Sequence, residues 1–327
     1  MNGPQFPGLL VVASLTVCVS GVAGAQDSVS RTPWGVPDLQ GVWDFRTITP
    51  MERPRDLAQK EFLTAEEAAE LEEIRAAENA ARDDEVPADI VGNYNTFWFD
   101  RGDSVIDTQR TSLVIDPPDG RVPALTPAAE RARAAMAKLR VDTGPHEPSP
   151  GGWVDDLGPN GLQVRCITGF NSGPPMTPGG YNNNVQLFQT EDTVILMNEM
   201  NHNVRVVPLD GRPHHALHQW TGDSRGHWDG DTLVIDTVNF LRETSFMRGG
   251  ASADLRLTER FTPVSAGVLM YEVTVNDPTI WTRPWTYAVP MQRNPDPMFE
   301  YACHEGNYSM EVILTGARTK ENEAAGR

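Results

Sequence analysis

The feature that most constrains the fold is a change of hydrophobic period after Gly180. From there on, apolar and polar residues alternate with the period of two that is typical of strands with one buried face. This pattern predicts strands at residues 185–190, 193–200, 204–208, 232–239, 255–262, 268–276 and 285–290. Short turn signals such as Glu191-Asp192 and Asp229-Gly230-Asp231 separate several of these strands, and no helical stretch lies between them. The spacing predicts an antiparallel meander rather than parallel strands joined by helices.

A meander of this length usually removes its exposed edges by closing on itself or by folding into two layers. We therefore expect a mainly β fold, either an antiparallel up-and-down barrel of lipocalin-like character or a sandwich. Earlier alternating runs at 41–47 and 111–115 are expected to join the same sheet. In the run 255–261, the alternation places Glu259 on the same face as three apolar residues.

Two helices are predicted before the strands. Thr64 and Glu67 form a capping box, in which each side chain binds the other residue's backbone N–H, and the Ala- and Glu-rich sequence behind them runs to about Asp84. A second helix is predicted from Thr126-Pro127 to about Arg140, because Thr is a good N-cap and Pro is favoured in the first turn. Residues 141–156 are rich in Gly, Pro and Ser and predict a long loop.

The first 25 residues predict a cleavable signal peptide. An uncharged apolar run, 9–25, ends in Ala23-Gly24-Ala25, which matches the small-residue pattern of a cleavage site. We expect a periplasmic or secreted product with a single domain over 26–327, helix-rich over 26–156 and β-rich over 157–318. No later segment reaches the length of a membrane span, so none is expected after cleavage.

Cleavage would leave two cysteines, Cys166 and Cys303. In the oxidising compartments to which signal peptides lead, such a pair usually forms a structural disulfide. We therefore predict a Cys166–Cys303 bridge, which would stabilise the fold by about 2–5 kcal/mol.

The charge excludes some partners. The chain has 45 acidic residues against 27 Lys and Arg, a formal balance of −18. Nucleic acids and anionic membrane surfaces would be repelled by this charge. With these partners excluded, we expect the protein to bind a small-molecule ligand or substrate.

Several long motifs carry a family resemblance: TPWGVPDLQGVWD at 32–44, RTSLVIDPPDGR at 110–121, GDSRGHWDGDTLVIDTVNF at 222–240, DPTIWTRPW at 277–285 and EYACHEGNY at 300–308. The chain resembles a widespread family of uncharacterised exported bacterial proteins. The resemblance covers most of the mature chain. It implies a single domain that is common to the family, and export from the cytoplasm. It implies no reaction, so function has to be inferred from the residues.

Two polar clusters at strand ends are the strongest candidates for chemistry. His304, Glu305 and Tyr308 follow Cys303 and combine a base, a carboxylate that can orient it and a proton donor. Glu199 and His202 end another predicted strand with the same residue types. We predict these five residues as catalytic, on the hypothesis that they converge on one cavity, with His202 and His304 as acid and base. Polar residues at strand ends are also common without any function.

Five further residues are predicted to bind a substrate. Arg205 and Arg283 could hold an anionic group, and Trp281 could stack on Arg283 or on a ligand. Tyr181 and Asn183 belong to a segment that is polar enough to line a pocket. Core packing and chain turns are the alternative interpretations for the aromatic and amide residues.

Two other motifs give weaker signals. His214 and His218 have an i,i+4 spacing that suits a metal only on a helix, and the preceding Pro213 favours a polar loop instead. Residues 222–226 match the G-x-S-x-G pattern of serine hydrolases, but an apolar strand follows where a helix is needed. We therefore interpret them as a turn in which Asp223 or Ser224 binds nearby backbone. No dinucleotide, phosphate-loop or haem-attachment motif is present, so no organic cofactor is expected.

Three functions remain open at this point. The first is a small-molecule enzyme that uses cofactor-independent acid/base chemistry of the lyase or isomerase type, in a pocket lined by strand residues. The second is a non-catalytic binding protein for an apolar or aromatic ligand. The third is a hydrolase that uses a divalent metal held by histidines between residues 202 and 227.

Overall fold

A computed structural model describes residues 29–84, 99, 100, 102–139, 159–242, 244 and 252–326. The strands are β1 (Gly41–Asp44), β2 (Val114–Asp116), β3 (Asn184–Gln189), β4 (Thr193–Asn198), β5 (Val204–Pro208), β6 (Asp223–Asp229), β7 (Thr232–Val238), β8 (Arg256–Pro263), β9 (Val268–Asn276) and β10 (Trp285–Asn294). The helices are α1 (Ala65–Asp84), α2 (Pro127–Leu139), α3 (Pro159–Val164) and α4 (Ser309–Ala324), with short 3₁₀ turns at Arg55–Leu57 and Met200–His202. None of the helices in these ranges has the length and apolar character to cross a membrane.

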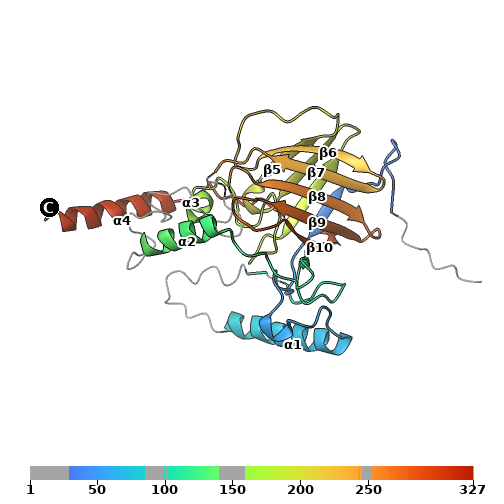
Figure 1. Ribbon diagram of the computed structural model, residues 1–327, viewed down its shortest axis with the longest axis horizontal. Helices are drawn as coiled ribbons and strands as arrows, with labels where there is room; N and C mark the ends of the chain where they lie inside the picture. Colours follow the sequence, from blue (N-terminus) through green and yellow to red (C-terminus); the bar gives the residue numbers. More distant parts are fainter. Residues whose placement is uncertain are drawn as a thin grey trace, which may run out of the picture.

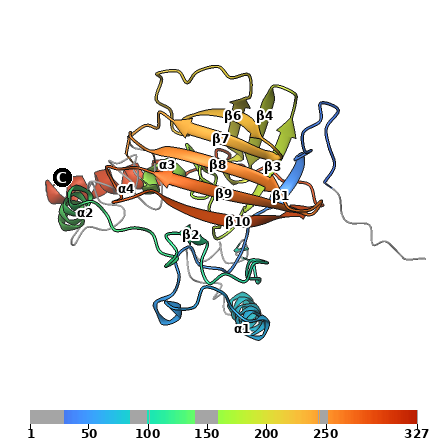
Figure 2. The same ribbon diagram turned by 45° about the vertical axis from the view of Figure 1, so that its right-hand side comes forward.

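All ten strands belong to one antiparallel sheet, which confirms the prediction of a mainly β fold (Figure 1). Its strand order is β5-β4-β3-β1-β10-β9-β8-β7-β6, with β2 paired to β10 as well. The five strands from β6 to β10 form the predicted meander, and β3 to β5 form a second one. β1 joins the two meanders by pairing with β3 on one side and β10 on the other (Figure 2). Both early runs therefore contribute to the sheet, although only residues 41–44 of the run 41–47 and residues 114–116 near the run 111–115 form strands.

The sheet curls until its two edge strands, β5 and β6, approach one another. No backbone ladder pairs them in the described part of the chain, so hydrogen bonds do not close the sheet into a barrel. Gly226 of β6 permits the close approach, because a Cβ there would lie 2.6 Å from the Leu209 side chain and 3.0 Å from Val207. We call the line where β5 and β6 meet the seam.

The inner face of the curled sheet is filled. Aromatic side chains from several strands are fully buried there, among them Trp285, Tyr287, Tyr271 and Phe261. The loop before β3 contributes Met176, whose backbone carbonyl accepts a hydrogen bond from Tyr287 at 2.6 Å and whose backbone N–H donates to Tyr271 at 3.1 Å. The sequence predicted a ligand pocket lined by inward-facing residues, but here protein side chains and this loop occupy that space.

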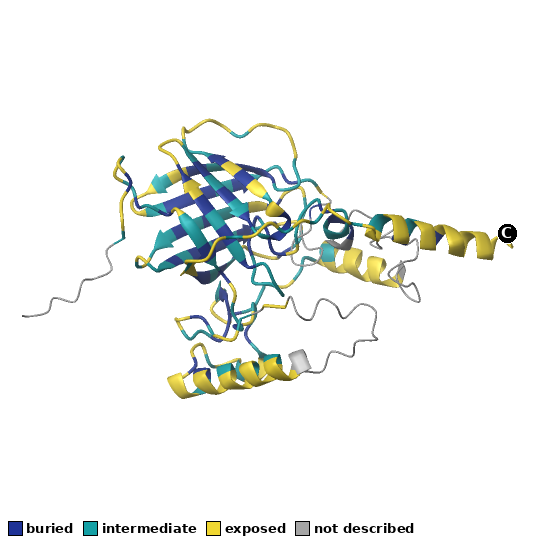
Figure 3. Cartoon of the chain, turned by 180° about the vertical axis from the view of Figure 1, so that it is seen from behind, coloured by how far each residue is buried: buried dark blue, intermediate teal, exposed yellow. Residues whose placement is uncertain are grey.

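α1, α2 and α4 lie outside the sheet and are mostly exposed, whereas α3 buries Leu162 (Figure 3). α1 begins with the predicted capping box, since the Thr64 N–H donates to Glu67 at 2.8 Å and the Glu67 N–H to Thr64 Oγ1 at 3.3 Å. α2 also begins and ends close to the predicted residues. α4, which buries only Ile313 and Ala317, was not predicted from the sequence, although Met310, Ile313, Leu314 and Ala317 have helical spacing.

The predicted disulfide is present between Cys166 and Cys303, which are 137 residues apart. The bond links the segment after α3, which contains Cys166, to the segment before α4, which contains Cys303. Its presence fits a protein of an oxidising compartment.

Two element predictions were wrong. Residues 222–226 were interpreted as a turn, but strand β6 begins at Asp223, because every residue from Asp223 to Asp229 pairs with β7. β10 continues to Asn294 rather than stopping at residue 290, since β1 pairs with its last residues. The signal peptide over 1–25 and the loop over 141–156 lie outside the described residues.

Candidate functional site

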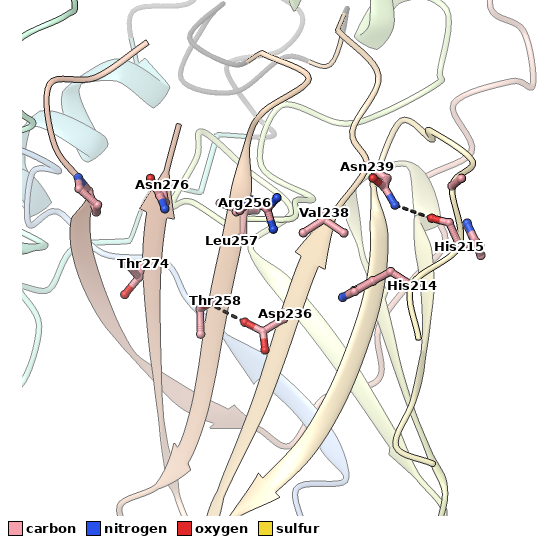
Figure 4. Close-up of a pocket in the computed structure, with 12 residues that line it drawn as sticks. His214, His215, Asp236, Val238, Asn239, Arg256, Leu257, Thr258, Thr274 and Asn276 are labelled. Carbon is pink, nitrogen blue, oxygen red and sulfur yellow. Dashed lines mark hydrogen bonds between the residues drawn. The ribbon is translucent and has the colours of Figure 1, made fainter. Parts of the chain in front are cut away.

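A pocket of about 700 Å³ lies on the outer face of β7, β8 and β9 (Figure 4). Outward-facing strand residues form its floor, and the loop between β5 and β6 covers one side of it with His214 and His215. Inward and outward residues alternate along each strand, so the residues of the pocket floor are adjacent in sequence to residues of the core. We call this cavity the outer pocket.

Asp223, the first residue of β6, holds the covering loop in place. Its carboxylate is 4% exposed and accepts a hydrogen bond from the backbone N–H of His215 at 3.0 Å. The ring nitrogens His214 Nδ1 and His215 Nε2 each lie 3.0 Å from it, and Arg225 donates to it at 2.6 Å. A buried carboxylate thus organises two imidazoles and a guanidinium.

Two opposing effects act on the pKa of Asp223. Burial alone would raise it, but the hydrogen bonds from the His215 backbone, from His214 and from Arg225 together lower it below its ordinary value. Asp223 is therefore ionised at neutral pH. An ionised carboxylate only accepts hydrogen bonds, so His214 carries a proton on Nδ1.

This tautomer has a chemical consequence. When Nδ1 of a neutral imidazole carries the proton, Nε2 has the free lone pair and acts as a base. The two ring nitrogens point in different directions, so Nε2 of His214 faces away from Asp223. Figure 4 shows the His214 ring extending from its loop over the pocket floor toward Asp236. The carboxylate of Asp236, on β7, accepts a hydrogen bond from Thr258 of β8 at 2.7 Å.

A smaller pocket of about 340 Å³ lies at the seam. Arg205 of β5 reaches inward from it and pairs with both carboxylate oxygens of Glu259, with Nη2 at 2.9 Å from Oε1. Tyr271 donates to the same carboxylate at 2.7 Å, and burial raises the pKa of Tyr271 well above its ordinary value, so it stays a donor. Arg205, which was predicted to bind a substrate anion, neutralises a buried carboxylate in this structure.

The structure brings the predicted catalytic clusters close to one another, on the surface. The His202 ring lies 3.2 Å from the Tyr301 carbonyl, next to the segment that holds His304, and both histidines are exposed. Glu199 accepts a hydrogen bond from Asn184 at 2.8 Å. Glu305 is exposed and Tyr308 is 71% exposed. None of the five lines the outer pocket or the seam pocket, and their catalytic role stays a prediction.

The other predicted binding residues have structural partners. Arg283 pairs with Asp116 at 2.8 Å on the surface, and Trp281 packs against Trp285 in the core. Asn183 is buried and binds the backbone around it, with its Oδ1 accepting from Gly179 at 2.7 Å. Tyr181 contacts two other aromatic rings, Phe99 and Phe170.

The residues of the G-x-S-x-G match and of the His214–His218 spacing have structural contacts. Ser224 is buried inside strand β6 and shares a hydrogen bond of 2.9 Å with Thr237, so it does not stand on the exposed turn of a nucleophile elbow. His218 binds the Phe240 carbonyl through Nδ1 at 2.8 Å. Among the described residues, no group of three His, Cys, Asp or Glu side chains is arranged to hold a metal ion.

His214 and His215 lie in the predicted polar loop, and Asp223 binds nearby backbone as predicted, at the His215 N–H. The contacts of Asp223 with the two imidazole rings were not predicted. Asp223 is only nine residues beyond His214, and no periodicity links a loop residue to the first residue of a strand. No protein-family model, curated protein or solved structure matches this chain. Function has to be argued from the geometry of the pocket.

Proposed function

We propose that the protein is an enzyme that moves protons on a small molecule bound in the outer pocket, in the manner of an isomerase or a lyase. One observation carries this proposal: the buried carboxylate of Asp223 lies within hydrogen-bond distance of one ring nitrogen of His214, an imidazole that lines a cavity. Carboxylate–imidazole pairs of this kind make a histidine an effective proton acceptor, because the carboxylate stabilises the cation that forms.

The chemistry follows from the two titratable groups that line the cavity. His214 Nε2 takes a proton from the bound molecule and, once protonated, returns it at another position. Asp236 provides a second acceptor on the opposite side, where Thr258 holds its carboxylate. A proton that returns to the same molecule gives isomerisation, whereas a proton delivered to a departing group gives elimination. Neither outcome needs a redox partner.

The lining also separates this proposal from a binding protein for an apolar ligand. The Arg256 guanidinium lines the outer pocket, and a purely apolar ligand would cover this charge without giving it a hydrogen-bond partner. The disulfide and the predicted signal peptide support an exported enzyme that acts outside the cytoplasm.

Deuterium exchange tests the proposal and does not require the product to be identified. The protein is incubated in D₂O with a panel of hydroxy acids, keto acids and sugars, and NMR detects loss of carbon-bound hydrogen or conversion of a compound. We expect exchange with the wild type and a loss of about 10²–10⁴-fold in H214Q.

H218Q is the matched control for this experiment. His218 lies on the same loop, but it binds a backbone carbonyl and does not line the outer pocket. We expect H218Q to exchange at the wild-type rate. Wild-type protein that promotes no exchange or conversion in the panel, or equal rates in H214Q and wild type, would contradict the proposal.

A further inference from the structure

The floor of the outer pocket has a regular polar pattern that indicates what it binds. Asp236, Thr258 and Thr274 are direct cross-strand neighbours on β7, β8 and β9. The next outward row along β8 and β9 pairs Arg256 with Asn276. Neighbouring strands are about 5 Å apart, so the two rows offer hydrogen-bonding groups at regular intervals on one surface. A molecule with hydroxyl groups around its perimeter can meet several of them at once.

Arg256 adds a positive charge to this pattern. It is exposed at the start of β8 and lines the outer pocket, as does Asn276. Within the described part of the chain, no carboxylate forms an ion pair with it, in contrast to Arg205, Arg225, Arg260 and Arg283. A guanidinium matches a planar carboxylate with two parallel hydrogen bonds.

The charge around Arg256 restricts the anion. Asp236 lies on the same pocket floor and the whole chain has a formal charge of −18, so a second negative charge on the ligand would be repelled. One guanidinium therefore suits a monoanion better than a dianion such as a phosphate ester.

From these observations we infer that the outer pocket binds a polyhydroxylated monocarboxylate of monosaccharide size, such as a uronic or aldonic acid. Arg256 anchors the carboxylate, and the row of Asp236, Thr258 and Thr274 binds the hydroxyl groups. A volume of about 700 Å³ lies within the range of small-molecule sites. The inference rests on the proposed function in that it assigns the substrate class of the same pocket.

Calorimetric titration with matched sugars tests the inference. The probes are glucuronate and galacturonate, the neutral sugars glucose and galactose, and glucose 6-phosphate. We expect the uronates to bind at least about tenfold more tightly than the neutral sugars, because a hydrogen bond to a charged group is worth more than a neutral one. R256Q should abolish this preference.

R260Q is the matched control, because Arg260 lies on the same strand and face but pairs with Asp229 outside the pocket. It should retain the preference for uronates. The inference is overturned if the uronates show no binding, if neutral sugars or glucose 6-phosphate bind as tightly, or if R256Q keeps the preference.

The two proposals fail in different measurements. Loss of the preference for uronates in R256Q supports the substrate class whatever the H214Q exchange rate is. Equal exchange in H214Q and wild type contradicts the acid/base proposal even if uronates bind through Arg256.

Discussion

Two buried carboxylates, one on each face of the sheet, have opposite environments. Glu259, on the inner face, is fully buried, and its partners Arg205 and Tyr271 are buried as well. Asp223, on the outer face, is almost as buried, but two of its partners, His214 and His215, line a cavity. Glu259 lines neither pocket and is reached from the seam pocket only through Arg205, whereas Asp223 contacts two imidazoles that line the outer pocket.

The comparison shows that burial of a charge does not by itself indicate a functional site. Both carboxylates have positively charged or hydrogen-bonding partners, as buried charges require. What differs is whether a partner still has an atom that a ligand can reach. Arg205 directs its guanidinium to Glu259, but the His214 ring binds Asp223 through one nitrogen and has a second one.

The largest effect on stability is expected from E259Q. It leaves the Arg205 guanidinium buried without a counter-charge, which should lower the free energy of unfolding by about 3–5 kcal/mol in denaturant titrations. A double variant, Arg205→Met with Glu259→Leu, should lose less than E259Q because no buried charge remains. If E259Q unfolds at the wild-type denaturant concentration, Arg205 does not need the charge of Glu259 to stay buried.

D223N should give a smaller loss of stability but a loss of activity as well. We expect the free energy of unfolding to fall by about 1–3 kcal/mol, since hydrogen bonds to a buried charged acceptor are weakened. Because the amide no longer fixes the His214 tautomer, the proton exchange seen in D₂O should fall about as far as in H214Q. Full exchange activity in D223N would show that Asp223 is structural only.

The pH dependence of stability should also differ between D223N and the wild type. The pKa of Asp223 is lower in the folded state than its ordinary value, so ionised Asp223 contributes stability above about pH 4. This contribution is lost as the pH falls through the lower native pKa. Thermal unfolding between about pH 6 and pH 2 should therefore show a steeper acid destabilisation in the wild type than in D223N. Parallel curves would contradict the lowered pKa.

The smallest effect is expected from S224A. Ser224 is adjacent to Asp223 in sequence but faces inward, where it binds Thr237 and lies 3.4 Å from Arg205. Its loss should cost about 1 kcal/mol of unfolding free energy and leave proton exchange unchanged. A large loss of proton exchange with intact folding would contradict the purely structural role of Ser224.

The sequence predicted the elements with strong local patterns. β5 and β9 have the predicted bounds, and the capping box of α1 is present. Period-two alternation and capping are short-range features, so they can be recognised before the fold is known. The start of β6 was missed because Asp223, Ser224 and Arg225 lack an apolar alternation. α4 was also missed, although its apolar residues at 310, 313, 314 and 317 have the spacing of an amphipathic helix.

By itself, the sequence determined the class of the fold, the disulfide partners and the inward direction of Glu259. Those properties depend on period, on cysteine number and on alternation along a single strand. Only the tertiary structure decided that the inner space is filled, that Arg205 neutralises Glu259, and that the loop with His214 covers an outer-face pocket. These contacts join residues on different elements, and their distances are set by how the whole sheet curls.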